Sequence, residues 1–160
     1  MDRAPPPSPS FGSETSLDPD PDPSTATFDL VPRTLADQQL WLQDRSGALA
    51  AIVAVEDGQV VGFSSLSHYK ERAAYRTTVE DSVYVHRDFQ GRGLGRALLS
   101  EICDVATLNG FHAVMARIES TGEASIATHA RCGFTVVGTE REVGRKFNRW
   151  HDVALMERLL

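Results

Sequence analysis

The chain has 160 residues, of which 41% are hydrophobic and 24% charged, and its formal net charge is −6. These totals predict a single globular domain with its own core, and the acidic balance argues against a nucleic-acid-binding protein, which needs a basic face. No apolar run approaches the length of about 18 residues that a membrane helix requires, so we expect no membrane association.

The beginning of the chain differs in composition from the rest. Residues 1–25 hold seven of the eight prolines, together with many serines and aspartates. A segment of this kind cannot bury enough apolar surface to offset the entropy of ordering it. We therefore expect a disordered tail over residues 1–23 and a folded domain over residues 24–160.

The cysteine content indicates the cellular compartment. Cys103 and Cys132 have no spacing typical of a metal site. We interpret them as reduced thiols, because free cysteine behaves as a small buried apolar residue. No basic patch followed by an apolar stretch marks a secretory signal. These features predict a cytoplasmic protein.

The first part of the predicted domain contains a helix and a hairpin. Residues 33–45 carry leucines at helical spacing behind Thr34, a residue type that caps helix starts. Residues 50–69 form two β-rich runs around Asp57-Gly58, which is typical of a two-residue hairpin turn.

The next predicted strand, residues 75–85, alternates in polarity, so its side chains should divide between two faces. One face would carry Thr77, Val79, Asp81, Val83 and Val85, and the other Thr78, Glu80, Ser82 and Tyr84.

The remaining elements complete the pattern of a mixed sheet. We expect a helix over residues 93–109, a buried strand over 112–118, a short helix within 122–134 and two final strands over 134–160. Gly110 and Gly133 would end the two helices. The order of strands, helix, strand, helix and strands predicts an α/β (α+β) fold.

Between the alternating strand and the long helix lies a glycine-rich loop, residues 90–96 (QGRGLGR). The free N–H groups and the dipole of a helix start favour an anion there. The phosphate-binding P-loop requires Gly-Lys-Ser/Thr, which is absent. The dinucleotide fingerprint requires Gly-x-Gly-x-x-Gly, whereas Gly91, Gly93 and Gly95 are spaced by two. The remaining pattern is Gln90-x-x-Gly93-x-Gly95, although a turn with positive φ would also use glycine.

This pattern resembles the acetyl-CoA pyrophosphate loop of the GNAT N-acetyltransferase superfamily. Its flanks, residues 78–99, 110–118 and 124–153, are similar to the phosphinothricin N-acetyltransferase branch, which includes methionine sulfoximine acetyltransferases. The similarity runs from about Ser24 to the C-terminus. The resemblance implies a GNAT fold: a twisted, mostly antiparallel mixed sheet with helices on both faces and a V-shaped opening for acetyl-CoA.

The resemblance also assigns the acetyl-CoA site. It implies that strand residues Val83, Tyr84 and Val85 pair with the pantetheine arm, and that a β-bulge there aims an N–H at the thioester oxygen. The pyrophosphate would be held by Gly91, Arg92, Gly93, Leu94, Gly95 and Arg96. Arg92 and Arg96 would add charge-assisted contacts, or they are solvated residues at a helix start. No cluster of metal ligands is evident, so we expect no metal.

Two residues are candidates for catalysis. Acetyl transfer needs a base that removes a proton from the acceptor ammonium. Glu80 suits this role because it lies three residues before Val83, and the resemblance assigns the base to the same glutamate. His129 stands where many members of the superfamily have tyrosine. It would protonate the departing thiolate or orient water, unless it is a structural hydrogen-bonding residue.

The substrates of this branch carry an amino acid carboxylate and a phosphinate or sulfoximine group, which suggests cationic recognition. Arg72 and Arg76 are candidates because arginine binds such groups bidentately, and Arg76 matches the family pattern better. Phe28 is a candidate wall of the pocket, with packing in the core as the alternative. Tyr75, Lys146 and Trp150 are weaker candidates. Members of the family usually form homodimers through their C-terminal strands, and we expect the same here.

Two features depart from the family pattern. Gly122 stands where relatives have an asparagine that contacts CoA, so one hydrogen bond to CoA should be missing. The proline-rich segment stands where relatives have a first strand and helix, so we expect the fold to lack those elements. Acetylation of a different amine, such as another amino acid or a peptide N-terminus, therefore stays open as an alternative. So does a non-catalytic acetyl-CoA-binding remnant.

Overall fold

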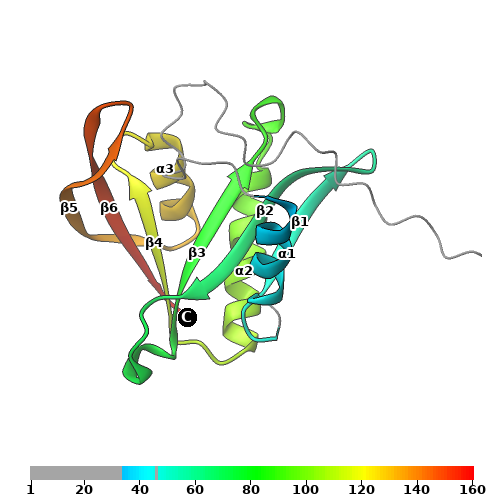
Figure 1. The fold of residues 1–160 in the computed structure, drawn as a ribbon, viewed down its shortest axis with the longest axis horizontal. Helices are drawn as coiled ribbons and strands as arrows, with labels where there is room; N and C mark the ends of the chain where they lie inside the picture. Colours follow the sequence, from blue (N-terminus) through cyan, green and yellow to red (C-terminus); the bar gives the residue numbers. More distant parts are fainter. Residues whose placement is uncertain (1–33, 46) are drawn as a thin grey trace, which may run out of the picture.

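A computed structural model describes residues 34–45 and 47–160 of the chain (Figure 1). The predicted tail over residues 1–23, the start of the domain and Phe28 lie outside the described residues. The six strands are β1 (Ala51–Glu56), β2 (Gln59–His68), β3 (Thr78–Val85), β4 (Ala113–Glu119), β5 (Thr135–Lys146) and β6 (Arg149–Leu159). The helices are α1 (Leu35–Gln43), α2 (Leu94–Leu108) and α3 (Glu123–Arg131), with short 3-10 turns η1 (Ala73–Tyr75) and η2 (Arg87–Phe89).

The ends of these elements follow from local sequence signals. The hydroxyl of Thr34 accepts a hydrogen bond from the Asp37 N–H, and the Asp37 carboxylate accepts from the Thr34 N–H, which forms a capping box at the start of α1. Asp57 and Gly58 both have positive φ, as expected at a tight hairpin turn between β1 and β2. Gly110 has a φ of 79° just after α2. The predicted helices, hairpin and strands are therefore confirmed.

The strands form one mixed sheet in the order β1-β2-β3-β4-β6-β5. Its neighbours are antiparallel except for β3 and β4, which run parallel. The parallel register covers only Thr78, Val79 and Glu80 of β3. Beyond Glu80 the two strands separate, and Figure 1 shows them close at one end and apart at their arrowheads. This separation, called the strand opening below, confirms the split sheet that the resemblance implies.

The strand opening is not accompanied by a bulge between β2 and β3. The antiparallel register runs without a shift from Gly62 opposite Val85 to His68 opposite Val79. The expectation of a β-bulge over residues 83–85 is therefore wrong for this pair of strands. Here β3 leaves β4 by diverging from it, while it stays fully paired with β2.

Helices cover both faces of the sheet. The buried Ser64 hydroxyl donates to the Leu98 carbonyl of α2 at 3.0 Å, so this face of β2 carries α2. The next residue toward the N-terminus, Phe63, faces the other way and makes an edge-to-face contact with Trp41 of α1, with ring centroids 5.8 Å apart. Figure 1 shows α1 in front of the sheet and α2 behind it.

The core lies between the sheet and the α2 face. Its fully buried members include Leu66, Val79 and Val114 from the sheet and Leu99 and Ile102 from α2. Because alternation sends Glu80, Ser82 and Tyr84 to the opposite face, these side chains lie on the α1 side. In the described parts of the chain, no helix is long and apolar enough to cross a membrane.

Candidate active site

The glycine loop ends in an uncapped helix start. Gly91 and Gly93 have φ of 75° and 83°, a region that costs other residues steric strain, and an added Cβ at either would meet no atom within 4 Å. Gly93 is the N-cap of α2. Because glycine has no side chain, it leaves the first N–H groups of the helix for another acceptor. The loop can therefore hold an anion through its backbone.

The loop is tied to the end of β3 and faces α3. The Gln90 side-chain amide donates to the Val85 carbonyl at 3.0 Å. A Cβ added at Gly95 would lie 3.7 Å from Val85 and 3.9 Å from Thr128 of α3. The start of α2 therefore lies beside the strand opening, between the end of β3 and α3.

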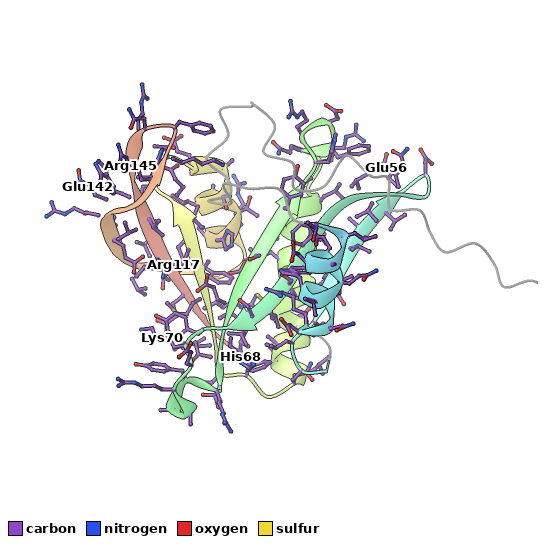
Figure 2. All side chains as sticks on the ribbon, in the orientation of Figure 1. Glu56, His68, Lys70, Arg117, Glu142 and Arg145 are labelled. Atoms are coloured by element: carbon purple, nitrogen blue, oxygen red, sulfur yellow. The ribbon has the colours of Figure 1, made fainter. Side chains whose placement is uncertain are left out.

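The two loop arginines differ in their surroundings. Arg92 donates to the Glu56 carboxylate and to the Asp88 carbonyl, both at 3.3 Å, and its guanidinium lies 4.9 Å from the centre of the Phe89 ring. Figure 2 shows Glu56 at the β1–β2 hairpin, which this contact joins to the loop. Arg96 is exposed. We therefore expect Arg92 to brace the loop, and Arg96 to be the freer cation for an anionic ligand.

Glu80 occupies the point where the sheet divides. It is the last residue of β3 that pairs with β4, opposite Met115, and it is partly buried. Burial raises the pKa of its carboxyl group, the charge of Arg117 opposes this, and the charges of Asp81 and Glu140 add to it. A carboxylate with a raised pKa at the closed end of an opening is suited to accept a proton.

A charged pair that was not predicted from the sequence shares this face. Arg117 of β4 is hydrogen-bonded to Glu140 of β5 as an ion pair. Arg117 stands opposite Leu155, and Glu140 opposite Val153, so both project on the Glu80 side of β4, β6 and β5. The signal in the sequence was an arginine inside the apolar run of residues 113–118.

His129 lies in a closed polar pair with Asp81. Its Nε2 is 3.1 Å from an Asp81 carboxylate oxygen, and its Nδ1 is 2.8 Å from the Ser125 carbonyl oxygen, to which it must donate. Burial lowers the pKa of His129, but the hydrogen bond and charge of Asp81 and the bond to Ser125 outweigh it, so the net pKa is raised. The imidazolium form can donate to both partners at once.

The structure therefore puts Glu80 and His129 on opposite faces of β3. Glu80 points to the α1 side, whereas Asp81, the next residue, points to the α2 and α3 side, where it meets His129. The two predicted catalytic side chains do not contact each other. Glu80 lies beside the strand opening on one face of the sheet, and His129 lies on the other face.

The predicted substrate arginines lie in the connection that leads into β3. Arg72 lines an open hollow of about 480 Å³ together with Lys70, Glu71 and Tyr75, and Arg76 is not among its lining residues. The Lys70 ammonium lies 4.7 Å from the centre of the Tyr69 ring. Figure 2 shows Lys70 and His68 at the end of the sheet where β2 finishes, the end at which β3 and β4 are paired.

Two of the weaker candidates, Lys146 and Trp150, lie at the β5–β6 hairpin, whereas Tyr75 lines the hollow with Arg72. Trp150 is 60% exposed, and the guanidinium of Arg145 lies 5.3 Å from the centre of its ring. Lys146 is buried, with its ammonium 5.1 Å from the centre of the Phe147 ring.

Gly122 begins α3 in a tight position. A Cβ there would lie 3.0 Å from the Glu119 carbonyl oxygen and 3.3 Å from an Ile118 methyl carbon. The same connection is held by the buried Glu119 carboxylate, which accepts from the Thr121 N–H at 3.0 Å and contacts His151 at 3.2 Å. His151 is therefore part of a structural cluster that also includes the Lys146 carbonyl, 3.2 Å from its Nε2.

Comparisons with known proteins agree with this arrangement. Residues 15–134 match the model of a family described as the acetyltransferase (GNAT) family. The chain is 38% identical over 136 residues to an L-methionine sulfoximine/L-methionine sulfone acetyltransferase of Pseudomonas aeruginosa, which covers 84% of this chain and 79% of the relative. It is 40% identical over 138 residues to a phosphinothricin N-acetyltransferase of Streptomyces coelicolor, with coverage of 84% and 81%.

A solved structure supports the same relationship. The crystal structure of a GNAT superfamily phosphinothricin acetyltransferase from Sinorhizobium meliloti, in complex with acetyl-CoA, superposes with a TM-score of 0.80. The two sequences are 36% identical, and the superposition covers 84% of this chain and 74% of that one.

Proposed function

The chain belongs to the acetyltransferase (GNAT) family, and on that premise we propose that it transfers the acetyl group of acetyl-CoA to a small amino acid such as phosphinothricin or methionine sulfoximine. The observation that carries this proposal is the position of Glu80, a carboxylate with a raised pKa at the last paired residue before β3 and β4 separate. The uncapped start of α2 beside the same opening supplies backbone donors for a pyrophosphate.

The residues of the chain would divide the chemistry as follows. Acetyl-CoA supplies the acetyl group as a thioester. Glu80 accepts a proton from the acceptor ammonium, directly or through one water, and the neutral nitrogen then bonds to the acetyl carbon as the carbon–sulfur bond breaks. A backbone N–H of Val83, Tyr84 or Val85 would stabilise the negative charge that develops on the thioester oxygen. The CoA thiolate leaves and takes up the second proton, which the nitrogen loses as it becomes the amide.

For His129 we propose a positioning role. Both ring nitrogens already have partners, so direct donation of a proton to the thiolate requires one of these hydrogen bonds to open. The pair with Asp81 instead fixes α3 against β3 at one side of the strand opening.

For the acceptor we propose an amino acid, because the two relatives are named as acetyltransferases of amino acids of this kind. Arg72 and Arg76 are the proposed contacts to its anionic groups, and Arg72 has the better position because it lines the hollow beside the start of β3. Phe28 remains a proposed pocket wall.

We further propose a homodimer in the cytoplasm. Strand β5 is an outer strand of the described sheet, and Val136, Val143 and Trp150 on β5 and β6 are each more than half exposed. Exposed apolar side chains on an outer strand and its neighbour favour a protein partner. Both cysteines are free thiols, which supports a reducing compartment. The mass in solution, measured by light scattering, tests the dimer.

The test of the proposed function is the release of free thiol from acetyl-CoA with phosphinothricin, methionine sulfoximine, ordinary amino acids and a peptide N-terminus as acceptors. We expect turnover with the first two, and a loss of about 10²–10⁴-fold in kcat for Glu80→Gln with an unchanged KM for acetyl-CoA. Turnover only with other amines would support the alternative acceptor. No turnover, combined with a rise in Tm on adding acetyl-CoA, would support a binding remnant.

A further inference from the structure

We propose that Arg117 is a specificity-determining residue that binds the carboxylate of the acceptor amino acid, and that Glu140 is its positioning residue. This inference rests on the proposed function, and it assigns the residue that binds the carboxylate of the acceptor. It concerns β4, on the opposite side of the strand opening from the candidate arginines that precede β3.

The first argument is position. Glu80 pairs with Met115 in the parallel register, and Arg117 is the next residue of β4 on that same face. Residues two apart on a strand are separated by about 6.6 Å. Figure 2 shows Arg117 on the side of the opening formed by β4, β5 and β6. The guanidinium is close enough for its charge to act on the Glu80 carboxyl group.

The second argument is the set of hydrogen-bond donors on Arg117. Its Nη2 bonds to the Glu140 carboxylate, and within residues 34–45 and 47–160 its Nε and Nη1 make no hydrogen bond. A guanidinium has five N–H donors in a rigid planar fork, so a second carboxylate can bind while Glu140 keeps its place. The Arg117 side chain is 42% exposed, which leaves it accessible to a small molecule.

The third argument is the chemistry of the acceptor. In an α-amino acid the ammonium and the carboxylate share one carbon atom, so a site that brings the nitrogen to Glu80 must place the carboxylate nearby. Glu80 and Glu140 are both acidic and would repel it. Arg117 lies on the same face and influences Glu80, so it can attract the carboxylate while the ammonium faces Glu80.

Glu140 contributes by holding the fork in place. The Glu140 side chain is 32% exposed. It belongs to β5, which is separated from β4 by β6 alone, so its side chain reaches Arg117 across β6 on the same face of the sheet. A bonded guanidinium loses less side-chain freedom when the acceptor arrives.

The test measures binding separately from turnover. Titration calorimetry with CoA at saturation gives the Kd of L-methionine sulfoximine and of its α-carboxamide, which keeps the amine and lacks the negative charge. We expect the unmodified protein to prefer the carboxylate by about tenfold or more, and Arg117→Gln to lose that preference. Arg117→Lys should recover part of it, because the charge remains without the fork. Glu140→Gln should keep the preference but bind the carboxylate more weakly.

The matched control is Arg131→Gln, which removes an exposed arginine at the end of α3. It should change neither Kd. Equal Tm values for Arg117→Gln and the unmodified protein exclude a folding defect. Retention of the carboxylate preference in Arg117→Gln would overturn the proposal, and so would an unmodified protein with no such preference. Thiol release with amines that lack a carboxylate would in that case still support acetyl transfer.

Discussion

His129 Nε2 lies 3.1 Å from Asp81 Oδ2, and the two side chains are only 5% and 1% exposed. The other oxygen of Asp81 is buried and has no hydrogen-bond partner among the described residues. A buried pair with one unsatisfied atom is costly to form and more costly to break, because the remaining partner would then be left alone. The pair therefore fixes the junction of β3 and α3 more than it adds to net stability.

The first prediction concerns the pH dependence of stability. Because the folded-state pKa of His129 is raised above its ordinary value of 6.5, its contribution should be fully present below about pH 6.5 and should be lost as the pH rises through the raised value. Urea unfolding at a series of pH values measures it. Asp81→Asn keeps a hydrogen-bonding group but removes the charge, and it should lack this fall in stability. The same fall in both proteins would contradict the assignment.

The second prediction uses the charges around Glu80. A general base works in its deprotonated form, so kcat should rise with pH through the Glu80 pKa. Arg117 lowers that pKa and Glu140 raises it. Arg117→Gln should therefore move the acid limb to higher pH, and Glu140→Gln should move it to lower pH. Measurement of kcat with saturating acceptor separates this effect from binding. Shifts in the same direction would argue against Glu80 as the titrating base.

The third prediction separates stability from acetyl-CoA binding at two glycines. Gly95 lies in the first turn of α2 and an added Cβ would have ordinary contacts, so Gly95→Ala should stabilise the helix by up to about 1 kcal/mol. The methyl group would nevertheless occupy the space beside the loop, so the KM for acetyl-CoA should rise. Gly93→Ala should lower both the stability and the affinity for acetyl-CoA, because a positive φ costs alanine about 1–2 kcal/mol. Denaturant unfolding and initial rates provide the two readouts. If Gly95→Ala and Gly93→Ala change the free energy of unfolding by the same amount, the different roles of the two glycines are contradicted.

The fourth prediction concerns Gly122. A side chain there meets the Glu119 carbonyl oxygen at 3.0 Å, so both Gly122→Ala and Gly122→Asn should destabilise the protein by about 1–3 kcal/mol. Only the asparagine can also supply a hydrogen bond to CoA, which should lower the KM for acetyl-CoA by at most about tenfold. If alanine lowers that KM as much as asparagine does, the missing hydrogen bond is not the reason for the difference.

Much of the fold follows from local signals in the sequence. Thr34, Asp57-Gly58 and Gly110 mark element ends through capping or turn chemistry, which needs no knowledge of distant residues. The alternation in β3 likewise places Glu80 and Asp81 on opposite faces.

The candidate site was less predictable because it depends on pairing between distant segments. Asp81 and His129 are 48 residues apart. Arg117 and Glu140 meet because the strand order β4-β6-β5 leaves one strand between them. Strand order and register are not encoded in the alternation of a single strand. The β-bulge was wrongly expected for a related reason, since the divergence of β3 from β4 is decided by the packing of whole strands.

The short parallel contact between β3 and β4 has a consequence for the lifetime of the protein in a cell. Within the described residues, only three residues of β3 pair with β4, so a ligand that lies along the strand opening would add contacts between the two halves of the sheet. At a concentration 100-fold above its Kd, such a ligand adds about 2.7 kcal/mol to the free energy of unfolding. Proteases act on the open form, so starvation for acetyl-CoA should shorten the half-life of the protein, and its abundance should follow the supply of this metabolite.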